Sequence, residues 1–132
     1  MKSKRHINLK KTVEKAFRQT AEAYDRANKE VIQQPRDWGS GFGVTKRRNG
    51  EIVVGGYRNI VDLGNLKDGQ TLTFTKPLTA TYEWQSNETP VSLVYWGYRT
   101  KNGFVPSRKW TEEALKEIDL SQVFIISFKE NL

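Results

Sequence analysis

The longest periodic stretch of the chain is LKKTVEKAFRQTAEAYDRANKEVIQ, residues 9–33. Its larger apolar and small side chains recur at steps of three and four residues, which is typical of one face of an α-helix. Asn8 can accept hydrogen bonds from the free amides of the first turn, and Pro35 disfavours helical geometry in the residue before it. The sequence therefore predicts a helix over residues 9–33 whose inward stripe is Val13, Phe17, Thr20, Tyr24, Ala27 and Val31.

This helix is long for a chain of 132 residues. At 1.5 Å per residue it extends about 36 Å, whereas the radius of gyration expected for a domain of this size is about 14 Å. We therefore expect one end of the helix to reach beyond the core, where it frays or packs on another subunit.

A β-hairpin is predicted after the helix, with Asn49-Gly50 as its turn between strands over 44–48 and 51–54. Asn-Gly favours two-residue hairpin turns because both positions take positive φ. The tip carries Lys46, Arg47 and Arg48, so we expect it to face solvent or an anionic partner. The preceding glycine-rich residues 37–43 lack the strand and helix that flank a phosphate-binding loop, and are predicted to be a flexible connector anchored by Trp38 and Phe42.

Further elements follow from capping and alternation. Asp62 is expected to cap a helical turn over 63–67 that Gly69 ends. Strict alternation predicts strands over 71–75 and 79–84. The apolar run 91–96 cannot be assigned by periodicity, and residues 98–101 have the composition of an exposed loop.

The C-terminal third is predicted to contain a helix over residues 110–118, because Trp110, Ala114, Leu115 and Ile118 fall on one face. The apolar, β-branched run 123–128 is predicted to be a strand, with a helix capped by Ser121 as the alternative. The fold expected is therefore α+β, with a long N-terminal helix, one antiparallel sheet of about four strands including the basic hairpin, and a second helix near the C-terminus. We expect a single domain over 1–132, made of a flexible basic end (1–8), the long helix (9–33), and the sheet with the C-terminal helix (44–132).

Charge is distributed unevenly along the chain, whose formal net charge is +7. Residues 1–58 hold 14 basic and 6 acidic side chains, whereas residues 59–132 hold 8 and 9. A one-sided basic surface attracts polyanions through long-range, salt-sensitive forces. The alternative is a solvated basic face that only keeps the protein soluble.

Groups that carry common enzyme chemistry are scarce. The chain has no Cys and one His, His6, which argues against thiolate sites, a Cys nucleophile, a metal centre and a Ser–His pair. Asp62 and Asp68 are the nearest carboxylate pair, but both lie among turn residues where Asp has an ordinary capping role. We therefore expect a protein that is not an enzyme and holds no metal or cofactor. No apolar run approaches a membrane span of about 18–20 residues, and no apolar segment follows the basic N-terminus as in a secretory signal.

Three segments in this order resemble the tail-completion and neck (head–tail connector) proteins of long-tailed bacteriophages. They are VDLGNLKD (61–68) after the basic hairpin, PVSLVYWGY (90–98), and PSRKW (106–110) before the last predicted helix. Members typically show Asp-Thr-Gly-x-Leu-Arg/Lys, then a Tyr-Ala-x-x-Val-His-x-Gly-like stretch, then Pro-x-Arg-Pro-Phe/Trp, after an N-terminal helix. This sequence departs from the family pattern at three positions. Leu63 replaces the usual Thr, Trp96 lies near the position of the usual His, and Lys109 replaces the second Pro.

The resemblance implies a structural virion protein that forms a homo-oligomeric ring at the head–tail junction, of neck, tail-completion or tail-terminator type, through which double-stranded DNA passes. Its partners would be itself, in six or twelve copies, portal or adaptor and tail-tube neighbours, and DNA bound without sequence preference. Its location would be the neck or tail top of the virion, assembled in the bacterial host cytoplasm. The roles implied are electrostatic lining of the DNA channel by Lys46, Arg47 and Arg48; subunit assembly by Phe17, Tyr24, Arg108 and Trp110; and structural motif positions at Asp62, Gly64, Leu66 and Gly97.

Two other functions stay open at the level of sequence. The basic first half and the aromatic content also fit a small nucleic-acid-binding domain that acts outside any virion. An enzyme using Asp62 and Asp68 is the third possibility. Sequence-selective binding by a monomer would favour the second function, and turnover abolished by substituting either Asp would favour the third.

Overall fold

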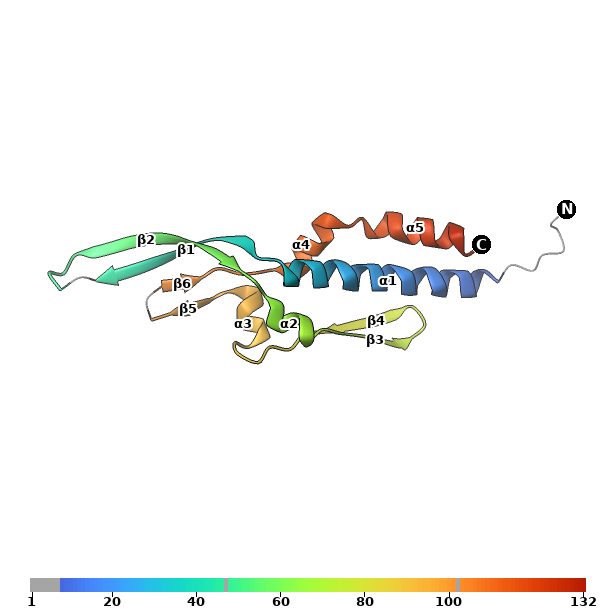
Figure 1. Ribbon diagram of the computed structural model, residues 1–132, viewed down its shortest axis with the longest axis horizontal. Coiled ribbons are helices and arrows are strands. Elements are labelled where there is room, and N and C mark those ends of the chain that lie inside the picture. Colours follow the sequence, from blue (N-terminus) through green and yellow to red (C-terminus); the bar gives the residue numbers. More distant parts are fainter. Residues whose placement is uncertain (1–7, 47, 102) are drawn as a thin grey trace.

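The protein is an elongated α+β molecule in the computed structural model, which describes residues 8–46, 48–101 and 103–132 (Figure 1). Helix α1 and the long β1–β2 hairpin extend in opposite directions from a central body, with α5 along one side of α1 and the β3–β4 hairpin along the other. The elements, in chain order, are α1 (Leu9–Gln33), β1 (Arg36–Lys46), β2 (Ile52–Val61), α2 (Gly64–Asp68), β3 (Thr71–Lys76), β4 (Thr79–Glu83), α3 (Val91–Trp96), β5 (Tyr98–Thr100), β6 (Gly103–Val105), α4 (Trp110–Glu117) and α5 (Leu120–Glu130).

Helix α1 confirms the predicted bounds. The side chain of Asn8 accepts a hydrogen bond from the backbone N–H of Lys11 at 3.1 Å, as expected of an N-cap. Ala27 and Val31 of the predicted stripe are buried and its other members are half-buried. Burial extends well beyond that stripe, to Thr12, Ala16, Ala21, Ala23, Asp25, Asn28 and Ile32, because α1 is covered on more than one side.

The N-terminal half of α1 is covered by α5 of the same chain, which runs antiparallel to it (Figure 1). The side-chain amide of Asn131 donates to Gln19 at 2.9 Å, and the Thr12 hydroxyl donates to the Asn131 carbonyl at 3.4 Å. Ala16 and Ser127 are both buried, and such small side chains let two helices approach closely. The end of α1 that reaches past the core is therefore packed within the chain.

The predicted strand over residues 123–128 is wrong, because this segment belongs to helix α5. Its side chains at positions 120, 123, 124, 127 and 128 are less exposed than those between them, which is the spacing of one helix face. Packing along α1 thus outweighs the strand preference of a β-branched run. The N-cap is Asp119, which accepts from the Gln122 N–H at 3.2 Å, and not Ser121 as the alternative had it.

The core lies where α1, α2, α3 and α4 meet. Its buried apolar members are Ala27, Val31, Ile32, Leu63, Leu66, Val94, Trp110 and Ala114. The Trp110 ring is in edge-to-face contact with Trp84 at 5.8 Å and with Tyr95 at 4.8 Å between centroids. Aromatic rings therefore join α3, α4 and the end of the β3–β4 hairpin around one buried tryptophan.

Within residues 8–46, 48–101 and 103–132, the strands form three separate antiparallel pairs, β1–β2, β3–β4 and β5–β6, so the expected single sheet of about four strands is wrong. Strands β3 and β4 confirm the predicted alternation, with Leu72, Phe74, Ala80 and Tyr82 turned inward. These side chains are covered by α1 and not by another strand: Phe74 contacts Phe17, and Tyr82 contacts Tyr24. Burial, followed by the charge of Asp25, raises the pKa of the Tyr82 hydroxyl, which donates to the Ala21 carbonyl at 2.6 Å.

The first hairpin is longer than predicted, and residues 37–43 belong to its strand β1 instead of forming a flexible connector. Gly41 and Gly43 pair with Tyr57 and Gly55 across the hairpin, so backbone pairing outweighs the poor strand preference of glycine. Lys46 and Ile52 are the last pair before the turn, and residues 47–51 connect them. Gly50 has the expected positive φ, 86°, whereas Asn49 does not, so the two-residue turn with two positive φ values is also wrong.

The remaining assignments are local. The turn after Asp62 is helix α2, one residue later than predicted and ended by Gly69 as expected. The predicted cap at Asp62 is wrong, because the N-cap position is Leu63. The unassigned run 91–96 is helix α3, and α4 confirms the helix predicted from Trp110, except that Leu115 lies on its exposed side. The expected exposed loop over 98–101 is wrong, since residues 98–100 form β5 and pair with β6.

Candidate functional site

The most prominent surface feature is the β1–β2 hairpin, residues 36–61, called the arm below. Its strands of 11 and 10 residues leave the body opposite α1 (Figure 1). At about 3.3 Å per residue the arm is roughly 33 Å long. Of the three predicted DNA-contacting cations near its end, Arg48 is exposed, whereas Arg47 and the side chain of Lys46 lie outside the part that the structure describes.

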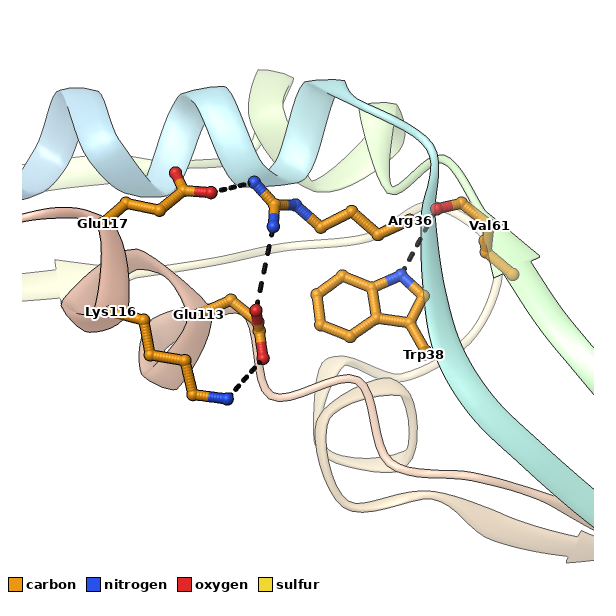
Figure 2. A network of polar contacts seen from close by, with 6 residues as sticks. All are labelled: Arg36, Trp38, Val61, Glu113, Lys116 and Glu117. Carbon is orange, nitrogen blue, oxygen red and sulfur yellow. Dashed lines mark hydrogen bonds and ion pairs between the residues drawn. The ribbon is translucent and has the colours of Figure 1, made fainter.

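The base of the arm is fixed to helix α4 by ion pairs (Figure 2). The Arg36 guanidinium pairs with Glu117, and its Nη1 lies 3.7 Å from Oε2 of Glu113. The other carboxylate oxygen of Glu113, Oε1, accepts a hydrogen bond from the Lys116 ammonium at 3.0 Å. Glu113 and Glu117 are four residues apart, so they lie on the same face of α4. Two carboxylates therefore hold the first residue of β1 against α4.

Hydrogen bonds between the strands complete the base of the arm. The indole N–H of Trp38 donates to the Val61 carbonyl at 3.3 Å, joining the start of β1 to the end of β2 (Figure 2). Arg58 pairs with Asp37 across the strands. The N–H of Gly39, which donates to Asp37 at 3.0 Å, and the Arg58 guanidinium together lower the pKa of Asp37. The stability that this carboxylate contributes is therefore present at neutral pH and is lost as the pH falls through its lowered pKa.

Arg108, expected to act between subunits, lies within this base. Its guanidinium lies against the buried side-chain amide of Asn59. With the Asn59 amide oriented so that its oxygen faces Arg108, this oxygen accepts hydrogen bonds from Nε at 2.9 Å and from Nη2 at 3.2 Å. Its backbone N–H donates to the carbonyls of Val94 and Tyr95 at 3.2 and 3.1 Å. Arg108 thus joins β2 to the end of α3 inside one chain.

The other predicted assembly residues also make contacts within the chain. Trp110 is 1% exposed in the core. Phe17 and Tyr24 are half-buried under β3 and β4. The contribution of Trp110 to assembly would therefore come through folding, since its side chain is buried in the core of its own chain.

The predicted motif residues have structural surroundings. The Asp62 side chain accepts from the Gly64 N–H at 2.9 Å, and Leu66 is buried in the core. Asp62, Leu66 and Arg108 line one small cavity of about 90 Å³ with Ser86 and Glu88. Gly97 ends α3 with a φ of 80° and lies against the chain that follows β6. Asp68 is not among the residues that line the cavity.

The sequence predicts the basic tip of the arm, but it does not predict the residues that fix the base of the arm to the body. The i, i+4 spacing of Glu113 and Glu117 was visible in the sequence, but nothing local to Arg36 predicts a contact with residues about 80 positions away. Within 8–46, 48–101 and 103–132, no group of three or more His, Cys, Asp or Glu side chains could hold a metal ion. No helix in those ranges is both long enough and apolar enough to cross a bilayer.

Substitution of Arg36, which fixes the base of the arm, is expected to lower the stability of the protein. Arg36→Ala is expected to lower the free energy of unfolding by about 1–2 kcal/mol, because it removes a partly buried guanidinium and leaves Glu113 and Glu117 beside each other. The control is Arg58→Ala, whose ion pair with Asp37 is exposed and is expected to contribute much less. Urea unfolding of both variants measures the difference, and an equal loss would mean that the contact with α4 does not fix the arm.

Comparison of the chain with protein-family models, with curated proteins and with solved structures finds no match.

Proposed function

We propose that the chain is a structural subunit of a tailed-bacteriophage virion that forms a homo-oligomeric ring at the head–tail junction, with the arms turned toward the DNA that passes through. The observation that carries the proposal is the arm itself: a two-stranded extension fixed at its base by Arg36 and charged near its tip. A fixed basic extension can bring charge to a central channel while the body stays in the ring wall. The three sequence segments that resemble neck and tail-completion proteins support the same role.

Charge supports contact with a polyanion. The chain carries +7, so six copies in a closed ring would carry +42. Lys and Arg near a hairpin tip attract phosphates without reading bases, which suits DNA that must move past. Such attraction weakens with salt because it depends on the release of counterions.

Exposed apolar side chains support association with other copies. Helices α4 and α5 expose Leu115, Ile125 and Ile126, and the turn between β3 and β4 exposes Leu78. Single exposed apolar residues are normal, but here they fall on flanks of a narrow molecule with a small core. A ring would cover these flanks on each side of every subunit.

A second candidate is a nucleic-acid-binding domain that acts as a single copy outside a virion. One observation favours it: Trp96 is 65% exposed, and the Lys109 ammonium lies 5.0 Å from the centroid of its ring. Exposed aromatic faces beside cations are typical of single-strand binding. This function predicts tight binding by a monomer and a preference for single strands, whereas the ring predicts weak, sequence-independent binding of double strands.

The proposed role of the arm is tested by the triple variant Lys46→Ala, Arg47→Ala, Arg48→Ala. It is expected to form rings as the wild type does and to bind double-stranded DNA more weakly. The slope of log affinity against log salt should fall by about 0.9 for each phosphate that the variant no longer neutralises. Mass photometry measures assembly, and a salt titration of DNA binding measures the slope.

The matched control removes the same charge from the exposed face of α1, as Lys10→Ala, Lys11→Ala, Lys15→Ala. This control should retain most of the DNA affinity. An equal loss in both triple variants would mean that DNA responds to net charge alone and would overturn the role given to the arm.

A further inference from the structure

The turn between β3 and β4 holds a leucine in a conformation that leucine rarely adopts. Pro77 and Leu78 connect the paired residues Lys76 and Thr79, and Leu78 has a φ of 62°. Leu78 is the only non-glycine residue with positive φ in the described ranges. The second central position of a type II turn favours Gly or Asn for this reason.

Burial within the chain does not account for this leucine. Leu78 borders a shallow cleft beside Phe17 and Phe74, yet 52% of its surface stays exposed. A strained, half-exposed apolar residue at the end of a hairpin gains little stabilisation from contacts within its own chain. Strain of this kind is retained where function requires the side chain.

A cleft of suitable character lies at the corner where α4 passes into α5. It is lined by residues 115–121, has a volume of about 610 Å³ and is open to solvent. Leu115 is 48% exposed, and Ile118 and Leu120 are half-buried, so three apolar side chains lie among the polar residues of its lining. We call it the corner cleft.

Charge at the corner cleft complements charge at the turn. Asp119 is exposed on its rim, and only one of its carboxylate oxygens is used to cap α5. Glu117 and Lys116, on the same rim, already pair with Arg36 and Glu113. Lys76, next to the turn, is exposed and has no acidic partner among the described residues. The Lys76 ammonium can therefore approach the Asp119 carboxylate while Leu78 enters the cleft.

The turn and the corner cleft lie on different flanks of the subunit. The β3–β4 hairpin contacts α1 at Phe17, whereas α5 contacts it at Gln19. At 3.6 residues per turn, side chains two positions apart leave a helix about 160° apart. Figure 1 shows the same arrangement, with the β3–β4 hairpin and α5 on opposite sides of α1. The turn of one copy thus cannot enter the corner cleft of the same copy.

We propose that Leu78 of one copy inserts into the corner cleft of the next copy, with Lys76 facing Asp119. This contact joins two different surfaces, so each copy presents one of each to its neighbours, and successive contacts close into a ring when the rotation permits. The inference rests on the proposed function, since it names the contact that would build the proposed ring.

The first test is Leu78→Asn, because Asn tolerates positive φ but lacks the apolar side chain. The melting temperature of the variant should not fall, whereas its self-association, measured by sedimentation velocity, should weaken by about tenfold or more. Leu93→Ala, at another exposed leucine, is the control and should associate as the wild type does. Unchanged association of Leu78→Asn would overturn the contact.

The second test uses the absence of native cysteine. In the double variant Leu78→Cys, Ser121→Cys, oxidation should produce a ladder of cross-linked multimers, since position 121 lines the corner cleft. The control pair Leu78→Cys, Ser92→Cys places the second thiol on exposed α3 and should give no ladder. Equal cross-linking in the two variants, or none in the first, would overturn the contact.

Failure of the contact and failure of the proposed function give different results. Wild-type rings that survive Leu78→Asn overturn only the contact. Cross-linked multimers that are open filaments, or rings that retain no DNA, overturn the proposed function and leave the contact standing. A wild type that stays a single copy overturns both.

Discussion

Gly97→Ala is expected to lower the free energy of unfolding by about 3 kcal/mol. Gly97 has a φ of 80°, a region in which any side chain strains the backbone. A β-carbon there would lie 2.6 Å from the Val105 carbonyl oxygen and 2.8 Å from the Ser107 nitrogen. Both are backbone atoms of the segment that leads from β6 to Arg108, so relief requires that this segment move away from α3.

The matched control for this prediction is Gly50→Ala. Gly50 has nearly the same φ, 86°, but no atom of the residues that the structure describes lies within 4 Å of the position its β-carbon would take. Its expected loss is the backbone strain alone, about 1 kcal/mol. Urea unfolding of the two variants separates crowding from strain, and equal losses would mean that the close approach at Gly97 does not constrain the fold.

Trp110→Ala is expected to lower the free energy of unfolding by about 3–5 kcal/mol, because it leaves a cavity at the centre of the core. The ring is 1% exposed and in contact with Trp84 and Tyr95, so its removal also loosens α3 and the end of the β3–β4 hairpin. Near-ultraviolet circular dichroism should lose intensity together with stability. Assembly should weaken for the same reason, without any specific effect on DNA contact.

Trp96→Ala is the control for the core tryptophan. Trp96 is 65% exposed and touches Tyr95 and Lys109, so its truncation should cost less than about 1 kcal/mol. A loss as large as that of Trp110→Ala would mean that the core is centred elsewhere. A Trp110→Ala protein that unfolds like the wild type would contradict the packing described for α4.

The parts of the fold that could be predicted from the sequence are those with a strong local signal. Helix α1 followed from its repeat, Asn8 and Pro35; β3 and β4 followed from alternation; and α4 followed from its apolar face. Each of these patterns predicts its own helix or strand, because one face of that element is buried and the opposite face is exposed.

Prediction was wrong where a distant partner decides the conformation. The run 123–128 has strand-like composition, but it is a helix because α1 offers a flank on which its residues pack. Residues 37–43 contain three glycines, which disfavour strands, but β2 supplies the backbone pairing. The number of strands in a sheet is likewise set by tertiary contacts: β3 and β4 are covered by α1 and, in the described part of the chain, pair with no third strand.

The candidate site likewise contains one part that the sequence predicts and one part that it does not. The cations 46–48 are adjacent in sequence, so the basic tip was visible at once. The anchor joins Arg36 to Glu117, and the proposed contact uses Leu78 and a cleft at residues 115–121. Both depend on packing between segments far apart in the chain, which no local pattern encodes.

In the proposed assembly, copies of this chain form a closed ring around double-stranded DNA with the arms directed inward. Electron microscopy of the purified protein mixed with linear double-stranded DNA would show such a ring. The expected result is a uniform ring of six or twelve copies with DNA through its centre and density for the arms lining the hole. Single copies scattered along the DNA, or particles without a central hole, would contradict the proposal.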